Sequence, residues 1–449
     1  MADVPLPQSW QGSERLPKTR RLLKNQWNVG EYTLPRPGIA DLGDQAGVAR
    51  GGFTYNEKLY MVYSNTLLRV DEDGTTTSVG FIDGTAQIDS AIGFNSAVII
   101  VRQSDGKGYT FDASEILTEI TDIDFLPSNS VCHINGRFVY IPFDGSPAFF
   151  SDVGAGQTIQ SDSFFDAEEL PDKNKVAFNS RNILYIGGTD SFELFRDVGD
   201  TPVPFRRLNA RQQHGYIGGI QEYSDTFAYV GRETDQDVGI YLISGGTSAK
   251  ISNEKIDTIL AGYTVLELSN AIPGRFKWRG YDILSYTLNY HSFGYYGGNW
   301  FVLDTRIENE NQPWKAGFIV QYNQKYYTSR GVNLGRLDKI NTDYGDGFER
   351  TIEFGFYNEN NDDFTAQSIE LGISQGYTDD GTVGLQLSRD NVLYSDAFFR
   401  STGEIGEYSD KLVWNYPGGL GYYEGFLGVR LTTTADIEFA CDKFTINLR

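Results

Sequence analysis

The residue types that most often carry catalysis are few in this chain and lie far apart in the sequence. The three histidines, His133, His214 and His291, have no spacing that would bring two of them to one metal ion. Cys132 and Cys441 are the only cysteines, and we expect two buried thiols in a reducing cytoplasm rather than a disulfide framework. The sequence also lacks a phosphate-binding loop of the Gly-x4-Gly-Lys type. We therefore predict no catalytic residue, no metal ligand and no cofactor.

Acidic residues offer another route to chemistry, through metal binding or glycoside hydrolysis. The stretch Asp71-Glu72-Asp73-Gly74 begins like a calcium-binding loop, but threonines follow it and no glutamate closes a loop of about twelve residues. A hairpin turn is the better interpretation, since Asp-Gly is a frequent turn pair. A glycosidase needs two carboxylates in one cavity, and among 60 acidic residues some will lie close together by chance. The sequence therefore gives no support for an enzyme.

The charge balance is strongly acidic. The chain has 38 basic and 60 acidic residues, a net charge of −22. Such a surface repels phosphates at long range, which disfavours sequence-specific DNA binding. A negative wall would still suit a conduit that passes DNA without holding it, and simple solubility is the alternative explanation of the charge.

The composition favours strands over helices. Aromatic residues make up 14% of the chain, and there are 50 glycines. Tyr and Phe suit strands, and Gly suits tight turns. We therefore predict an all-β fold.

One pattern recurs along the first three quarters of the chain: an apolar strand, a short polar turn and a second apolar strand. The turn markers are Asn56, Asn95, Asn135, Asn179, Ser224, Arg279 and Asn323. Asn and Ser tolerate the positive φ of tight hairpins. Successive markers are 39, 40, 44, 45, 55 and 44 residues apart, which suits propeller blades of about 40–50 residues. The repeats predict a β-propeller with seven blades, or six if residues 319–327 belong to the next domain.

The longest interval contains the one clear helical region, residues 252–271. Its apolar face consists of Ile256, Ile259, Leu260 and Tyr263. Thr264 and Glu267 have the spacing of a capping box. The apolar face needs a partner surface, either the propeller rim or a neighbouring subunit, and we expect it to make subunit or adaptor contacts.

The pattern divides the chain into three parts. Residues 46–335 are the expected propeller, with the helical insert at 252–271, and residues 336–449 form a separate C-terminal β domain of the sandwich type. Residues 1–45 contain five prolines and are expected to form an extended N-terminal arm. The basic residues of this arm, candidates for docking on an acidic partner, are Arg15, Lys18, Arg20, Arg21 and Lys24. A flexible solvated arm is the alternative.

Several segments, taken in order, are similar to a known family. They are Pro37-Gly38-Ile39 with Arg50-Gly51 and Leu59-Tyr60, Tyr223-Ser224-Asp225 through Tyr241-Leu242-Ile243, Ser252 to Ile256 running into Tyr263-Thr264 and Glu267-Leu268, Leu412-Val413-Trp414, Phe426 to Arg430, and Phe444-Thr445-Ile446. On these segments, over residues 36–449, the chain resembles the packaged-DNA stabilisation or tail-hub (head-completion, tail accessory) proteins of short-tailed bacteriophages. It departs from the family pattern in its first 35 residues and over 286–300.

The resemblance implies a structural virion protein without catalytic activity, assembled in the cytoplasm of the host bacterium. It implies a homohexameric ring below the portal and its head-to-tail adaptor, which acts as a tail hub or nozzle. Such a ring would extend the DNA channel, retain the packaged DNA and anchor tailspikes or tail fibres and a needle or plug. Phage DNA would pass through it transiently during ejection, without sequence-specific binding.

Two other classes are compatible with a β-propeller: a carbohydrate-binding module and a propeller-fold glycoside hydrolase. The N-terminus lacks the apolar core of a signal peptide, which disfavours a secreted protein. No stretch approaches the roughly 20 apolar residues of a membrane span. We therefore expect no membrane association.

Overall fold

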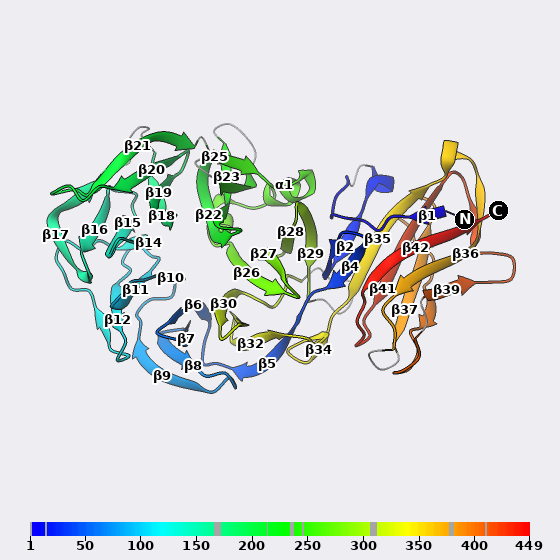
Figure 1. The fold of residues 1–449 in the computed structure, drawn as a ribbon, viewed down its shortest axis with the longest axis horizontal. Helices are drawn as coiled ribbons and strands as arrows, with labels where there is room; N and C mark the ends of the chain where they lie inside the picture. Colours follow the sequence, from blue (N-terminus) through cyan, green and yellow to red (C-terminus); the bar gives the residue numbers. More distant parts are fainter. Residues whose placement is uncertain are drawn as a thin grey trace.

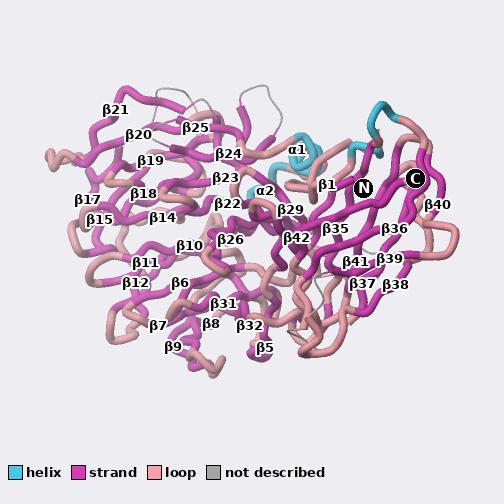
Figure 2. Tube along the Cα trace, turned by 45° about the vertical axis from the view of Figure 1, so that its right-hand side comes forward, coloured by secondary structure: helices cyan, strands magenta, loops and turns pink. Residues whose placement is uncertain are grey.

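The computed structural model describes all residues except 1, 14–15, 166–171, 213, 234–237, 245–246, 306–311, 377–380 and 409–410. Strands dominate the described residues, and helices are short (Figures 1 and 2). Within these residues, none of the helices has the length and apolar character needed to cross a membrane. The expectation of an all-β fold is confirmed.

Five four-stranded antiparallel sheets follow one another, each with its strands in sequence order. The first contains β6 (Ala49–Tyr55), β7 (Lys58–Tyr63), β8 (Thr66–Val70) and β9 (Thr76–Phe81). The second contains β10 (Ile88–Ile92), β11 (Ser96–Val101), β12 (Gly108–Asp112) and β13 (Leu117–Glu119). The third contains β14 (Ser128–Ile134), β15 (Arg137–Pro142), β16 (Ala148–Asp152) and β17 (Ala155–Phe165). The fourth contains β18 (Asn174–Ser180), β19 (Ile183–Gly188), β20 (Phe192–Asp197) and β21 (Phe205–Gln212). The fifth contains β22 (His214–Tyr223), β23 (Thr226–Glu233), β24 (Val238–Ser244) and β25 (Thr247–Lys250).

Two further groups of four strands lie within larger sheets. One contains β26 (Ile272–Trp278), β27 (Tyr281–Thr287), β28 (Ser292–Tyr296) and β29 (Asn299–Leu303). The other contains β30 (Phe318–Tyr322), β31 (Lys325–Arg330), β32 (Asn333–Asp338) and β5 (Gly38–Asp44), and is extended by β33 (Thr342–Asp343) and β34 (Asp346–Gly347). Strand β5 pairs antiparallel with β32 and is followed in the chain by β6. The N-terminal region therefore ties the last group of strands to the first.

The inner strands are arranged in a ring (Figure 1). The first strand of each group contacts the first strand of the next, in the order β6, β10, β14, β18, β22, β26 and β30, and β30 contacts β6. Residues of all seven strands line one central cavity of about 220 Å³. This radial arrangement is that of a β-propeller. The assignment of these groups to seven blades stays a prediction from the repeats.

The hairpin turns explain the repeat in the sequence. The markers Asn56, Asn135, Ser224, Arg279 and Asn323 have φ between 45° and 51°, each directly after the first strand of its group. Two-residue hairpins of this kind require positive φ at the central positions. The other two groups differ, because Asn95 ends a three-residue turn and Asn179 lies within β18.

The predicted helical insert consists of two short helices, α1 (Glu254–Leu260) and α2 (Val265–Ser269). The capping box is present at α2. The Glu267 N–H donates to Thr264 Oγ1 at 3.2 Å, and the Thr264 N–H donates to Glu267 Oε2 at 2.9 Å. A helix of five residues depends on such a cap, because it has few internal hydrogen bonds of its own.

Replacing Thr264 with alanine is expected to destabilise α2 by about 1 kcal/mol, because the Glu267 N–H loses its acceptor. Hydrogen exchange of the α2 amides measures this loss locally. Thr258→Ala is the matched control, since Thr258 lies inside α1 and its hydroxyl donates only to the Glu254 carbonyl. Equal exchange at α2 in both variants would contradict the capping role.

The C-terminal region forms two sheets that pack face to face. One contains β1 (Ala2–Val4), β42 (Cys441–Leu448), β36 (Phe364–Ile373) and β39 (Lys411–Asn415), with β40 (Gly421–Tyr423) paired to β36. The other contains β2 (Leu22–Lys24), β35 (Arg350–Tyr357), β41 (Phe426–Thr433), β37 (Thr382–Ser388) and β38 (Phe398–Ser401). The rings of Phe354 and Phe444, one from each sheet, lie 5.0 Å apart in the shared core. Because β2 also pairs with β29, this sandwich and the propeller share one continuous sheet.

The first 45 residues do not form the expected extended arm. They contribute β1, β2, β5, the hairpin of β3 (Gln26–Val29) and β4 (Tyr32–Pro35), and a 3₁₀ turn η1 (Pro17–Thr19). The physical reason is the apolar content between the prolines. Leu23, Trp27 and Ile39 are at most 1% exposed and belong to the core that also contains the sandwich residues.

Candidate functional site

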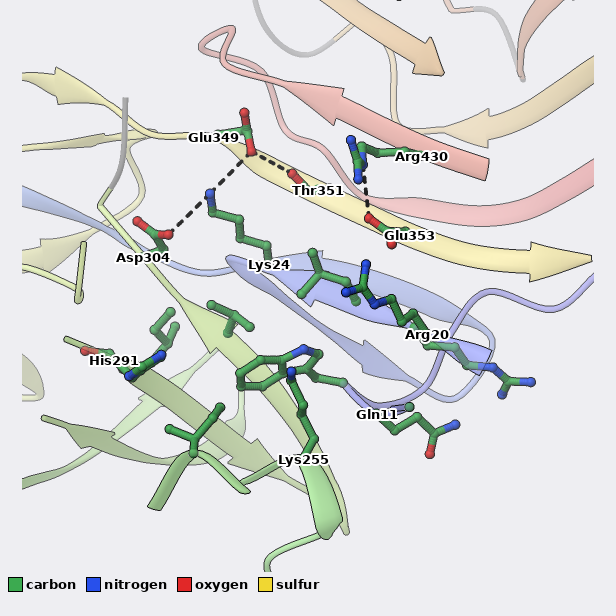
Figure 3. A pocket seen from close by; sticks show the side chains of 18 of the residues that line it. Gln11, Arg20, Lys24, Lys255, His291, Asp304, Glu349, Thr351, Glu353 and Arg430 are labelled. Atoms are coloured by element: carbon green, nitrogen blue, oxygen red, sulfur yellow. Dashed lines mark hydrogen bonds and ion pairs between the residues drawn. The ribbon is translucent and has the colours of Figure 1, made fainter. Parts of the chain in front are cut away.

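A cleft of about 1010 Å³ lies between the propeller and the sandwich (Figure 3). We call it the junction cleft. Its wall includes Arg20, Arg21 and Lys24 from the N-terminal region and Ile259 from α1. The sequence suggested two separate contact sites, the basic residues of the N-terminal region and the apolar face of the helical insert. The fold brings residues of both groups into the wall of one cleft.

Several charged side chains in the wall of the junction cleft are largely buried. Lys24 Nζ lies 3.3 Å from Asp304 Oδ2 and 3.3 Å from Glu349 Oε1, and the side chains of Lys24 and Asp304 are 6% and 4% exposed. On the facing strands, Arg430 Nε donates to Glu353 Oε2 at 3.0 Å. Figure 3 shows both sets of contacts. The Lys24 pairs join the N-terminal strand β2 to the propeller on one side and to the sandwich on the other. The Arg430–Glu353 pair joins β41 to β35 within the sandwich.

The basic cluster of the N-terminal region is divided by the fold. Lys24 is buried and paired, so it is not available for docking. Lys18 and Arg21 are exposed, Arg20 is half-buried, and Lys18 Nζ lies 4.9 Å from the centroid of the Phe426 ring. Arg15 lies outside the described residues.

The apolar face of the helical insert is covered by the propeller itself. Ile256 and Leu260 are fully buried in one cluster with Ile240 and Trp300, and Ile259 packs against its margin. Ile256 and Leu260 are therefore unavailable to a second subunit or an adaptor. The propeller rim covers this apolar face instead. It was the other partner surface considered from the sequence.

Tyr263 joins the insert to the propeller through its hydroxyl group. Tyr263 Oη lies 2.7 Å from His291 Nδ1, and the Tyr290 N–H donates to Tyr263 Oη at 3.2 Å. Ring contacts accompany these bonds, with the Tyr263 and Tyr290 rings stacked at 6.3 Å. The side chain therefore helps to seat the insert on the propeller.

The histidines and cysteines lie in separate environments. In the part of the chain that the structure describes, no group of three His, Cys, Asp or Glu side chains could hold a metal ion. Burial lowers the pKa of His133, His214 and His291, and burial raises the pKa of both cysteine thiols. His214 Nδ1 lies 2.5 Å from Ser248 Oγ, but its Nε2 is 3.7 Å from Glu233 Oε2 and does not form the hydrogen bond that a catalytic triad requires.

The central cavity of the propeller is narrow and polar. Asp89 lies on its wall, where its carboxylate accepts the Val131 N–H at 3.0 Å and the Ser130 hydroxyl at 3.1 Å. Burial raises the pKa of this carboxyl group, while the nearby Arg102 guanidinium opposes that shift. These contacts tie β10 to β14 next to the propeller axis.

A family model and a relative of known function are similar to most of this chain. A family model described as "Bacteriophage P22 Gp10, beta-propeller" matches residues 18–341. The chain belongs to this family. The tail hub protein gp10 of Salmonella phage P22 is 22% identical over 428 residues, which cover 89% of this chain and 88% of that protein. The resemblance inferred from the sequence is confirmed, and so is the β-propeller: the chain is a structural phage tail hub protein and a component of the virion tail.

Two solved structures are similar to this member of the gp10 family at low sequence identity. The computationally designed Ika8 protein has a TM-score of 0.38 at 11% identity, over 66% of this chain and 99% of that one. The N-terminal domain of Nup159 has a TM-score of 0.41 at 10% identity, over 70% of this chain and 98% of that one.

Several residues of the junction cleft had no signal in the sequence. Trp10, Asp304, Glu353 and Arg430 line it from four distant segments. No motif links these positions, because contacts between distant segments bring them together: β2 pairs with both β29 and β35, β35 pairs with β41, and the Trp10 N–H donates to the Trp300 carbonyl.

Proposed function

We propose that copies of this chain form a ring in the tail of a short-tailed phage, six by the family resemblance, below the portal and the head-to-tail adaptor. In this position the ring extends the DNA channel, retains the packaged DNA and anchors tailspikes or fibres and a needle or plug. The ring is assembled in the host cytoplasm and acts without catalysis. The observation that carries this proposal is the match to the P22 tail hub protein, because it spans both the propeller and the sandwich.

The size of the central cavity supports a channel formed between copies. The cavity inside the propeller has a volume of about 220 Å³ and is lined by the inner strands themselves. A DNA duplex, whose major groove alone is about 12 Å wide, does not fit there. A passage for DNA therefore requires several copies around a common axis.

Deletion of the gene tests the proposed function. Phage particles assembled without this protein are expected to lose their DNA after packaging, because the portal end is not sealed. Nuclease-protected DNA per particle is the measurement, and the wild-type gene supplied in trans is the control. Particles that retain their DNA and infect normally without the protein would contradict the proposal.

The net charge of −22 predicts the character of the channel wall. We expect Asp and Glu to outnumber Lys and Arg on the surface that faces the channel, so that DNA is repelled evenly and slides during ejection. Lysine substitutions at channel positions are expected to slow ejection, and more so at low salt, because they bind phosphates. A net positive wall, or ejection rates unaffected by these lysines, would leave solubility as the explanation of the charge.

We also propose that the cations Lys18, Arg20 and Arg21 dock on an acidic partner surface. Their separation from the buried Lys24 supports this proposal, since Lys18 and Arg21 are exposed and Arg20 is half-buried.

A further inference from the structure

One corner of the sandwich presents apolar side chains to solvent, from a hydrogen-bonded loop and from the N-terminal segment beside it. Leu16, Val392 and Leu393 are 63%, 51% and 77% exposed. Asp390 Oδ1 accepts the N–H groups of Val392 at 2.8 Å and Leu393 at 2.9 Å, which fixes the loop. Asn391 Nδ2 donates to the Pro17 carbonyl at 2.9 Å, which joins the loop to η1. Apolar residues held in place at the surface are typical of binding sites.

The same corner is locally basic in a chain that is strongly acidic. Lys18, Arg21 and Arg389 are exposed there, and Arg20 is half-buried. Within the described residues, no ion pair neutralises Arg21 or Arg389. The Asp390 carboxylate is a negative charge in this corner, since the hydrogen bonds from backbone N–H groups lower its pKa. Lys18, Arg20, Arg21 and Arg389 outnumber it, so the corner keeps an excess of positive charge. We call these cations, with Leu16, Val392 and Leu393, the basic corner.

The propeller carries a second exposed apolar patch, at the turns of its second and third sheets. Ile92, Phe94 and Val153 are 42%, 85% and 63% exposed. The Phe94 ring contacts the His133 ring at 5.6 Å between centroids. The Gly154 N–H donates to the Gly136 carbonyl at 2.7 Å, which holds the turn that carries Val153 against the first turn of the same sheet.

This second patch is acidic. Asp152 adjoins Val153, and Asp197 Oδ2 accepts a hydrogen bond from Asn135 Nδ2 at 3.0 Å. Among the described residues, no cation forms an ion pair with Asp152 or Asp197. Arg137 is directed inward, where its Nη1 donates to the Ser151 carbonyl at 2.9 Å. We call Ile92, Phe94, Val153, Asp152 and Asp197 the acidic rim.

We propose that the acidic rim of one copy packs against the basic corner of the next copy in the ring. The two patches match in apolar exposure and are opposite in charge. They cannot meet within one chain, because the sheets of β10–β21 lie at the left end of Figure 1 and the sandwich lies at the right end. A contact between two different patches of identical chains is head-to-tail and closes into a ring when the rotation permits. This inference rests on the proposed ring of copies.

A cysteine pair tests this contact in assembled phage particles. The double variant Val153→Cys with Leu393→Cys is expected to give a ladder of disulfide-linked multimers on a non-reducing gel after mild oxidation. Each single variant is expected to stay monomeric. Cys132 and Cys441 are buried and free, so they do not add cross-links of their own. Val153→Cys with Val265→Cys is the control pair, since Val265 is 56% exposed but lies outside the basic corner.

Charge reversal gives an independent readout of the same contact. Asp152→Arg with Asp197→Arg, or Arg21→Glu with Arg389→Glu, is expected to lower incorporation into particles at least about tenfold. The two changes combined in one chain are expected to restore incorporation. Arg21 and Arg389 are exposed, and Asp152 and Asp197 are half-buried and outside the apolar core. Circular dichroism of the purified variants is therefore expected to match the wild type, which separates a lost contact from a lost fold.

Each other outcome has a defined meaning. Multimers from a single-cysteine variant would show a contact between like patches and overturn the inference. A cross-link from either patch to a different tail protein would also overturn it. Particles that contain several copies but give no multimers would overturn it while leaving the ring intact. A single copy per particle would instead contradict the proposed function itself.

Discussion

Replacing Asp343 with alanine is expected to lower the free energy of unfolding by about 3–5 kcal/mol. Asp343 and Arg36 are both fully buried, with Arg36 Nη2 2.6 Å from Asp343 Oδ2 and Nη1 2.9 Å from Oδ1. The Arg36 guanidinium also lies 3.6 Å from the centroid of the Phe348 ring. Without the carboxylate, the core would hold a guanidinium with no counter-charge. Asp343 pairs with β5, so the loss affects the strand that ties the two ends of the propeller together.

An ion pair at the surface, with the same nitrogen–oxygen distance, provides the control for this prediction. Arg336 Nη2 lies 2.6 Å from Asp338 Oδ2, but the Asp338 side chain is 42% exposed. Asp338→Ala is therefore expected to cost only about 0–1 kcal/mol. Urea denaturation followed by tryptophan fluorescence and circular dichroism compares the two variants. Equal losses in both would contradict the structural role of the buried pair.

Replacing Leu260 with alanine is expected to cost about 2–5 kcal/mol, because it leaves a cavity in the core between α1 and the propeller. The Leu260 side chain is fully buried in a cluster with Ile240 and Trp300. The loss is expected in the isolated chain, as a lower midpoint of urea denaturation. This result would separate a role in folding from the subunit-contact role that the apolar periodicity alone suggested.

Leu266 provides the matched control in the same insert. Its side chain is 74% exposed on α2, so Leu266→Ala is expected to change stability by no more than about 0.5 kcal/mol. If Leu260→Ala left the isolated chain as stable as Leu266→Ala and impaired only its assembly, the intramolecular packing described here would be wrong.

The repeated part of the fold was predictable because one local rule recurs. Asn56, Asn135 and Asn323 are markers in the sequence for the same reason that they have positive φ in the structure: tight hairpins require that conformation. The capping box at Thr264 was predictable for a similar reason, since four consecutive residues contain the whole signal. Local chemistry of this kind does not depend on the rest of the chain.

The N-terminal region and the junction cleft were not predictable because they depend on partners far along the chain. Leu23 pairs in register with Ile352, and Lys24 contacts Asp304 and Glu349. A basic residue near the N-terminus has the same local sequence whether it lies in solvent or in a core. The apolar face of α1 was recognised correctly, but periodicity shows only that a face is covered and does not show which surface covers it.

Electron cryo-microscopy of the tail of intact virions tests the central claim most directly. The account predicts several copies of the chain around the tail axis, with a duplex-wide channel between copies and no passage for DNA through the centre of any propeller. A single copy, a position away from the tail axis, or DNA inside a propeller would contradict it.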